Sequence, residues 1–313
     1  MTTKTNPLGP FLEQQGCFIL DGGLASELEA RGHDLNDPLW SARLLIEEPE
    51  AIQAVHETYL AAGADCIITA SYQATVPGFL ARGQDLAGAR ALLRRSVELG
   101  MAARDAYWGD GNGHTGRLRP LVAASIGPYG AFLADGSEYD GRYGLSRAEL
   151  REFHAERWLL LAASDADLLA CETIPSFLEL QALTDLLAGG QKWAWFSFSC
   201  ADERHLHDGT PILDCVEWLA AYERVAAVGI NCTAPHLIPE LVRRVSEATD
   251  RPVIVYPNSG EQYDPATKRW YGTAEPADFA QASCQWRDLG ASVIGGCCRT
   301  GPDHIRLIRE SLL

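Results

Sequence analysis

The segment ASVIGGCCRT, residues 291–300, carries an apolar run into a pair of adjacent cysteines. An earlier run ends in the same way, as VGINC at residues 228–232. Successive side chains of a strand point to opposite faces, so Cys297 and Cys298 can serve one metal only where the strand has ended, and the two preceding glycines let the backbone turn there. Three thiols at the ends of two strands predict an open-sided zinc site, with Cys232, Cys297 and Cys298 as ligands.

The same unit, a short apolar run that stops at a polar residue, occurs eight times. The runs are 17–21, 66–71, 121–126, 167–172, 193–199, 227–232, 252–257 and 292–298. Near-continuous apolar runs are typical of parallel strands that are covered on both faces. Segments of helical period lie between them, at 49–62, 82–107, 147–164, 177–188, 212–222, 239–248, 276–289 and 302–312. Eight alternations predict an α/β fold, a (β/α)8 TIM barrel, with a doubly wound sheet as the weaker alternative.

Composition limits the partners. The 313 residues carry a net charge of −16 and no lysine- or arginine-rich block, so we expect neither a nucleic-acid nor an anionic-membrane partner. No linker divides the chain, and we predict one domain over 1–313, with 1–12 as a flexible tail. The first ten residues lack the apolar core of a signal peptide, and nine scattered cysteines fit reduced thiols. We therefore expect a cytoplasmic protein.

In a parallel barrel the active site lies at the carboxyl ends of the strands. The predicted strand ends are Asp21, Ser71, Ser125, Glu172, Ser199, Cys232, Asn258 and Cys297–Cys298. The two carboxylates either contribute to the chemistry or cap the helices that follow them. Three long connections, 22–48, 72–85 and 129–146, are expected to wall the site. Their aromatic side chains either face a cationic ligand or pack the loop.

A competing metal motif is His205-Leu206-His207-Asp208. A His-Asp metal hydrolase would need this pair at a strand end, with further histidines at other strand ends. The pair lies several residues beyond its strand, and no other predicted strand ends in histidine. We interpret this segment as a solvated loop.

Seven segments carry a resemblance to a known family. They are LDGGLASELEARG at 20–32, ITASYQAT at 68–75, SIGPYGAFLADGSEYDG at 125–141, LLACETIPS at 168–176, GINC at 229–232, VIVYPNSGE at 253–261 and IGGCCRT at 294–300. Together they make the whole chain resemble the homocysteine S-methyltransferases, of the free-standing, single-barrel kind that uses S-methylmethionine or S-adenosylmethionine.

The resemblance implies roles for individual residues. Asp21 and Glu172 would receive the homocysteine ammonium, and the backbone amides of Gly22 and Gly23 its carboxylate. Asn231 would support the zinc loop. The donor contacts implied are Trp40 and Tyr72.

The implied reaction is zinc-dependent transfer of a methyl group from a sulfonium to homocysteine, giving methionine, an activity like EC 2.1.1.10. S-Methylmethionine is expected as the better donor, S-adenosylmethionine as the slower one, and betaine to fail. One alternative is methylation of selenohomocysteine or another thiol. Alternatives of a different class are a thiol redox switch, with Cys297 and Cys298 as a vicinal disulfide, and the metal hydrolase.

Overall fold

Eight parallel strands form the centre of the molecule. The computed structural model describes residues 5–35, 37, 39–109, 116–260, 262–264, 269–271 and 275–313. The strands are β1 (Phe18–Ile19), β2 (Cys66–Ile68), β3 (Leu121–Ile126), β4 (Leu168–Ile174), β5 (Ala194–Phe198), β6 (Val225–Asn231), β7 (Val253–Tyr256) and β10 (Ala291–Ile294). They pair in the order β1-β10-β7-β6-β5-β4-β3-β2, and a bridge between Leu20 and Cys66 brings the two ends of this sheet together. The predicted (β/α)8 barrel is confirmed.

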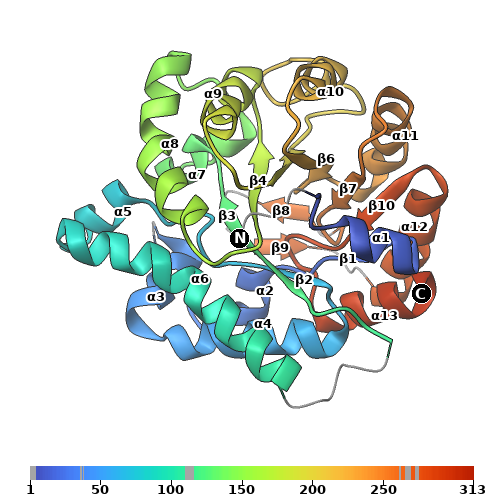
Figure 1. Ribbon diagram of the computed structural model, residues 1–313, viewed down its shortest axis with the longest axis horizontal. Helices are drawn as coiled ribbons and strands as arrows, with labels where there is room; N and C mark the ends of the chain where they lie inside the picture. Colours follow the sequence, from blue (N-terminus) through green and yellow to red (C-terminus); the bar gives the residue numbers. More distant parts are fainter. Residues whose placement is uncertain are drawn as a thin grey trace.

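Helices surround the strands as an outer ring (Figure 1). They are α4 (Pro49–Ala62), α6 (Leu86–Gly109), α8 (Arg147–Ala162), α9 (Phe177–Ala188), α10 (Ile212–Ala220), α11 (Ile238–Ala248), α12 (Pro276–Asp288) and α13 (Pro302–Leu312). Each predicted strand and helix is present, with ends that differ by a few residues. β10 ends at Ile294, so the predicted strand 292–298 is a strand only in its first part. No helix among the described residues has the length and apolar character to cross a membrane.

The long connections contain short elements that the periodicity did not predict. They are α2 (Leu24–Ala30), η1 (Trp40–Arg43) and α3 (Leu44–Glu47) after β1, α5 (Val76–Ala81) after β2, and α7 (Tyr129–Leu133) with η2 (Ser137–Tyr139) after β3. A single 3-10 turn, η3 (Pro235–Leu237), precedes α11, and an antiparallel hairpin of β8 (Gln262–Asp264) and β9 (Arg269–Tyr271) follows β7. The elements after β1, β2 and β3 lie in the three connections that were predicted to line the site.

Side chains inside the barrel follow the two-residue period of a strand. Leu168 and Ala170 of β4 point into the interior core, together with Trp195 of β5 and Ile254 of β7. Leu169, the residue between the first two, packs instead in the core between strands and helices. The inward alternation of β4 continues to Glu172, which is how an apolar strand delivers a carboxylate to the barrel mouth.

The predicted flexible tail is wrong for the described part of 1–12. Residues 5–8 lead into the helix α1 (Gly9–Gln15), which contains 9–12, and residues 1–4 lie outside the described residues. Leu8 is 0% and Phe11 3% exposed, and both join the interior core of the barrel. Phe11 meets Phe18 edge-on, with ring centroids 4.8 Å apart. Asn6 donates a hydrogen bond to the Ala226 carbonyl at the start of β6 (2.8 Å), so the segment covers the amino-terminal end of the barrel.

Candidate metal and substrate site

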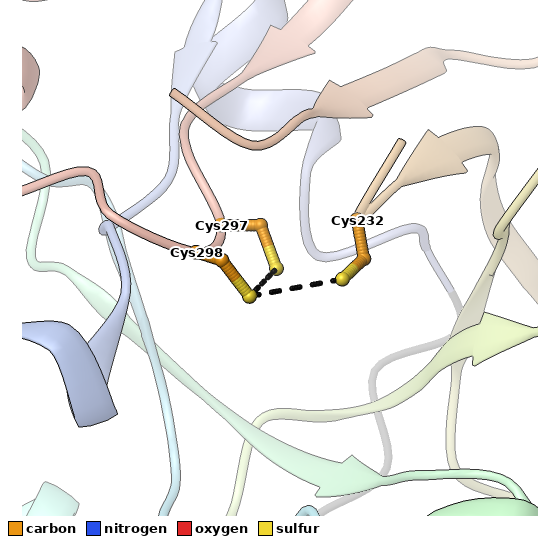
Figure 2. A group of neighbouring side chains, drawn as sticks. All are labelled: Cys232, Cys297 and Cys298. Carbon is orange, nitrogen blue, oxygen red and sulfur yellow. Dashed lines mark hydrogen bonds between the residues drawn. The ribbon is translucent and has the colours of Figure 1, made fainter. Parts of the chain in front are cut away.

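Three cysteine sulfurs meet at the carboxyl end of the barrel (Figure 2). The Sγ atoms of Cys232 and Cys298 lie 3.8 Å apart, those of Cys297 and Cys298 lie 4.0 Å apart, and all three fall within 4.8 Å of one another. Zinc–sulfur bonds of ~2.3 Å at tetrahedral angles place two thiolates about 3.8 Å apart. The three predicted ligands are therefore brought together at a spacing that suits one tetrahedral metal ion.

The backbone beyond each strand sets this geometry. Cys232 follows β6 directly and takes a left-handed conformation, with φ of 48°. Its amide donates to the Tyr256 carbonyl (3.2 Å), while the Cys297 amide donates to the Pro257 carbonyl (2.8 Å). Both ligand loops are thus tied to the end of β7, which lies between β6 and β10 in the sheet.

The thiols of the trio affect one another. Hydrogen bonds from the Cys232 and Cys297 thiols hold the pKa of the Cys298 thiol well below its usual range. Hydrogen bonding within the trio therefore favours a thiolate, the form that binds a metal.

Glu172 lies on the inner face of the barrel mouth and is 7% exposed. Its Oε1 accepts a hydrogen bond from the Ser125 hydroxyl, and its Oε2 accepts one from the Tyr256 hydroxyl (3.1 Å). Burial raises the pKa of this carboxyl to about 7, against the lowering effect of both hydrogen bonds. The group is held in place and only half ionised near neutral pH.

Asp21 is the second carboxylate of the mouth and is 2% exposed. Its Oδ2 accepts a hydrogen bond from the Ile68 amide of β2 (2.8 Å), and its Oδ1 is buried without a partner among the described residues. Burial raises the pKa of Asp21 well above its usual range; the Ile68 amide lowers it, and the Glu172 carboxylate adds to the rise. An unpartnered oxygen here would accept a hydrogen bond from a cationic ligand.

The alternative role of these carboxylates as helix caps is wrong. The helix after Asp21 is α2, whose N-cap is Gly23, without a side-chain cap. The helix after Glu172 is α9, which is capped by the Ser176 side chain. Neither carboxylate serves the helix that follows it, so both are left to face the mouth of the barrel.

Gly22 and Gly23 pack the first loop against the metal-ligand loop. A Cβ at Gly22 would lie 2.6 Å from the Thr300 carbonyl oxygen, and one at Gly23 would lie 2.5 Å from the Cys297 carbonyl oxygen. The Gly23 amide already donates to the Thr300 carbonyl (2.9 Å). Because the Gly23 amide is hydrogen-bonded within the protein, only the Gly22 amide of the two predicted contacts remains available to a substrate carboxylate.

Asn231 braces the residue after Glu172. Its Oδ1 accepts from the Thr173 amide and its Nδ2 donates to the Thr173 hydroxyl, both at 2.7 Å. Thr173 needs this support because its φ is 59°, a conformation that β-branched residues rarely adopt. Asn231 therefore links the metal loop of β6 to the carboxylate of β4.

Two further aromatic side chains approach this region from the loops. The rings of Trp40 and Tyr72 meet edge-on, with centroids 6.3 Å apart, and the Tyr72 hydroxyl interacts with Thr173. Tyr139 is one of the aromatic residues expected in the wall loops, and its hydroxyl lies 3.2 Å from the Cys232 sulfur. The sequence did not single out Glu138, whose Oε2 is buried without a hydrogen-bond partner among the described residues. Both lie on a single turn, η2, which carries no periodic signal.

The His205–His207 motif takes the loop role that we predicted. His205 pairs with Asp202 on its own loop (3.0 Å), and the His207 ring packs edge-on against Tyr139. Across the described ranges, the group of side chains that could hold a metal is the cysteine trio, and neither histidine belongs to it.

The sequence and the structure were compared with known proteins. The family model for homocysteine S-methyltransferase matches residues 18–312. Homocysteine S-methyltransferase YbgG of Bacillus subtilis is 50% identical over 97% of this chain and 96% of its own length, and the Escherichia coli homocysteine S-methyltransferase is 50% identical over 98% and 99%.

The similarity extends to solved structures. The metallated form of the homocysteine methyltransferase MmuM from Escherichia coli superposes with a TM-score of 0.88 at 48% identity, covering 97% of this chain and 99% of that one. With full-length sequence similarity, the same barrel and a metal-bound relative, the chain belongs to the homocysteine S-methyltransferase family.

Proposed function

We propose that this protein transfers a methyl group from a sulfonium donor to the thiol of homocysteine and so produces methionine. The observation that carries the proposal is the trio Cys232, Cys297 and Cys298 beside the unpartnered carboxylate oxygen of Asp21. The donor's S–CH3 bond breaks and leaves its electron pair on the donor sulfur. The homocysteine sulfur gains the new S–CH3 bond and releases its proton.

The metal of this proposal is zinc. Its fit rests on the sulfur spacings and on a thiol donor set, which zinc prefers. When bound, zinc with three thiolate ligands supplies an open coordination position at which a fourth thiol loses its proton near neutral pH. Cys232, Cys297 and Cys298 would hold it, with Asn231 fixing the start of the Cys232 loop.

Homocysteine would be oriented by its amino-acid end. Asp21 and Glu172 are buried, acidic and close enough to raise the pKa of Asp21, which favours a shared ammonium ligand. The Gly22 amide would contact the carboxylate. Fixing both charges leaves the side-chain sulfur to reach toward the cysteine trio, and this alignment lowers the activation barrier by orientation.

The methyl donor would enter between the loops after β1, β2 and β3. Trp40 and Tyr72 offer ring surfaces there, and a cation over such a ring is attracted by ~0.5–2 kcal/mol. We propose S-methylmethionine as the preferred donor, with slow use of S-adenosylmethionine.

A second candidate acceptor is a selenol. Selenocysteine Se-methyltransferase of Brassica oleracea var. italica is 48% identical over 96% of this chain and 90% of its own length. Offering selenocysteine and selenohomocysteine beside homocysteine in one assay would rank the three acceptors.

The central test replaces each cysteine in turn. Cys232→Ser, Cys297→Ser and Cys298→Ser should each lose methionine formation and retain much less zinc, with the fold unchanged by circular dichroism. Cys284→Ser is the matched control, because Cys284 lies on α12, outside the trio, and should keep both zinc and rate. A trio variant that keeps zinc and rate would contradict the ligand set.

Two further outcomes would contradict other parts of the proposal. Zinc-free protein with full activity after thiol alkylation would contradict the zinc mechanism, and turnover with betaine but with neither sulfonium would contradict the donor.

A further inference from the structure

We propose that Glu138 binds the positively charged group of the methyl donor. This inference rests on the proposed function, because it assigns a residue to the donor of that reaction. It concerns a side chain that lies outside both the cysteine trio and the Asp21–Glu172 pair.

The turn that carries Glu138 is fixed next to the metal ligands. Its neighbour Tyr139 places its hydroxyl 3.2 Å from the Cys232 sulfur. Its backbone is packed against Gly130 of α7 so closely that a Cβ at Gly130 would collide with the Glu138 amide nitrogen. The position of Glu138 beside the trio is therefore built into the loop between β3 and α8.

One oxygen of the Glu138 carboxylate is unsatisfied there. Its Oε2 is buried and has no hydrogen-bond partner in the part of the chain that the structure describes. The charged groups that act on it are the Cys232 thiol and the Asp135 carboxylate, and Glu138 in turn acts on the Tyr72 phenol. All of these groups are neutral or negative, so none of them compensates a buried carboxylate.

A cation would resolve this arrangement. An uncompensated carboxylate buried beside thiolates is unfavourable, and an opposite charge within a few ångströms reverses the sign of the interaction. The donor of the proposed reaction carries a sulfonium and an ammonium, and its methyl group must approach the trio. Glu138 supplies the negative charge for such a cation. Aromatic surface comes from the Tyr72 ring, whose phenol feels the charge of Glu138, and from the Trp40 ring that packs against Tyr72.

Homocysteine is a poorer ligand for Glu138. Its sulfur carries no positive charge, and its one ammonium is already matched to Asp21 and Glu172 at the strand ends. The donor brings the additional cation that this second acidic position lacks.

The test compares Glu138→Gln with Asp140→Asn. Both remove one negative charge from the same loop, but Asp140 is exposed and paired with Arg142. In Glu138→Gln, the Kd of S-methylmethionine, measured by titration calorimetry on the zinc-loaded enzyme without homocysteine, should rise about 10- to 100-fold. Asp140→Asn should stay within about twofold of wild type. The KM for homocysteine and the zinc content should be unchanged in both variants.

A second ligand locates the cation. Dimethylsulfoniopropionate has the sulfonium but no ammonium, so weaker binding of both ligands to Glu138→Gln assigns the sulfonium, and weaker binding of S-methylmethionine alone assigns the ammonium. Unchanged binding of both overturns the inference, as does an equal loss of donor, homocysteine and zinc affinity. If wild-type enzyme forms no methionine from any sulfonium, the proposed function itself fails, whereas normal wild-type turnover with an unaltered Glu138→Gln rejects only the role of Glu138.

Discussion

Glu172 illustrates how single residues of this site are prepared for a charged ligand. Its two oxygens are held by Ser125 and Tyr256, and burial leaves its pKa at about 7. Such hydrogen bonds fix the carboxylate in position without neutralising it. A bound ammonium would stabilise the ionised carboxylate and so lower the pKa of Glu172, and the proton would be released to solvent.

Replacement of Glu172 by glutamine should weaken homocysteine binding and remove part of its pH dependence. A charge-assisted hydrogen bond contributes ~1.5–3 kcal/mol, so the Kd should rise roughly 10- to 100-fold at pH 8. Because the carboxyl pKa is about 7, wild-type Glu172 is charged above that pH and takes a proton below it. Wild-type binding should therefore weaken as the pH falls from 8 to 6, and the variant should show a flatter profile.

Calorimetric titration of homocysteine at several pH values would measure this, with zinc content as the control. An unchanged Kd at pH 8 would remove Glu172 from the substrate site. A profile as steep as that of wild type would assign the pH dependence to Asp21 instead.

At the scale of elements, a buried polar network joins the loops after β2 and β3 to the helices α8 and α9. Arg157 donates to the Gly127 carbonyl (2.6 Å) and the Tyr72 carbonyl (3.2 Å), and it contacts His154. His154 bonds Glu179, whose Oε1 also accepts from the Tyr129 amide (2.6 Å). The donor side of the site therefore depends on charges that lie within the helix layer.

Arg157→Met should lower the free energy of unfolding by roughly 3–5 kcal/mol, because it removes the buried cation that is joined to the buried Glu179 carboxylate through His154 and acts on it by charge. Adding Glu179→Gln to that variant should restore part of the loss. The exposed pair Arg90–Glu156 is the matched control, and Arg90→Met should cost only ~0–1 kcal/mol. Urea unfolding of the four proteins measures these differences. A double variant no more stable than Arg157→Met would show that the network is not held together by charge.

The elements differ in how far the sequence could predict them. Helices α9 and α13 begin and end where predicted, since Ser176 caps the first and Pro302 opens the second. Strand ends identified Glu172 and the three cysteines because an apolar run stops at each. The turn η2 could not be predicted, because its path depends on left-handed backbone at Ala134 and Gly136 and on contacts with distant loops.

At the scale of the whole molecule, the barrel has two unlike ends. The carboxyl end carries the cysteines and the unpartnered carboxylate oxygens of Asp21 and Glu138. The amino end is filled by apolar side chains, among them Phe11 of α1 and Leu8, the residue before that helix. The sequence did not predict this cover, because seven residues of helix containing one proline are too short for a periodic signal.

Removal of residues 1–12 should therefore destabilise the barrel without changing its chemistry. The truncation exposes interior side chains such as Phe18, which packs edge-on against Phe11, and losing a buried phenylalanine and a buried leucine costs ~2–5 kcal/mol each in comparable cores. Removal of residues 1–4 alone keeps Leu8 and Phe11 and serves as the control.

Thermal unfolding should show a markedly lower Tm for the longer truncation only. The kcat and the zinc content of the folded protein should match wild type, because α1 lies at the opposite end from the trio. Equal Tm values for the two truncations would mean that α1 contributes little to the core, and a selective loss of kcat would mean that the two ends of the barrel are coupled.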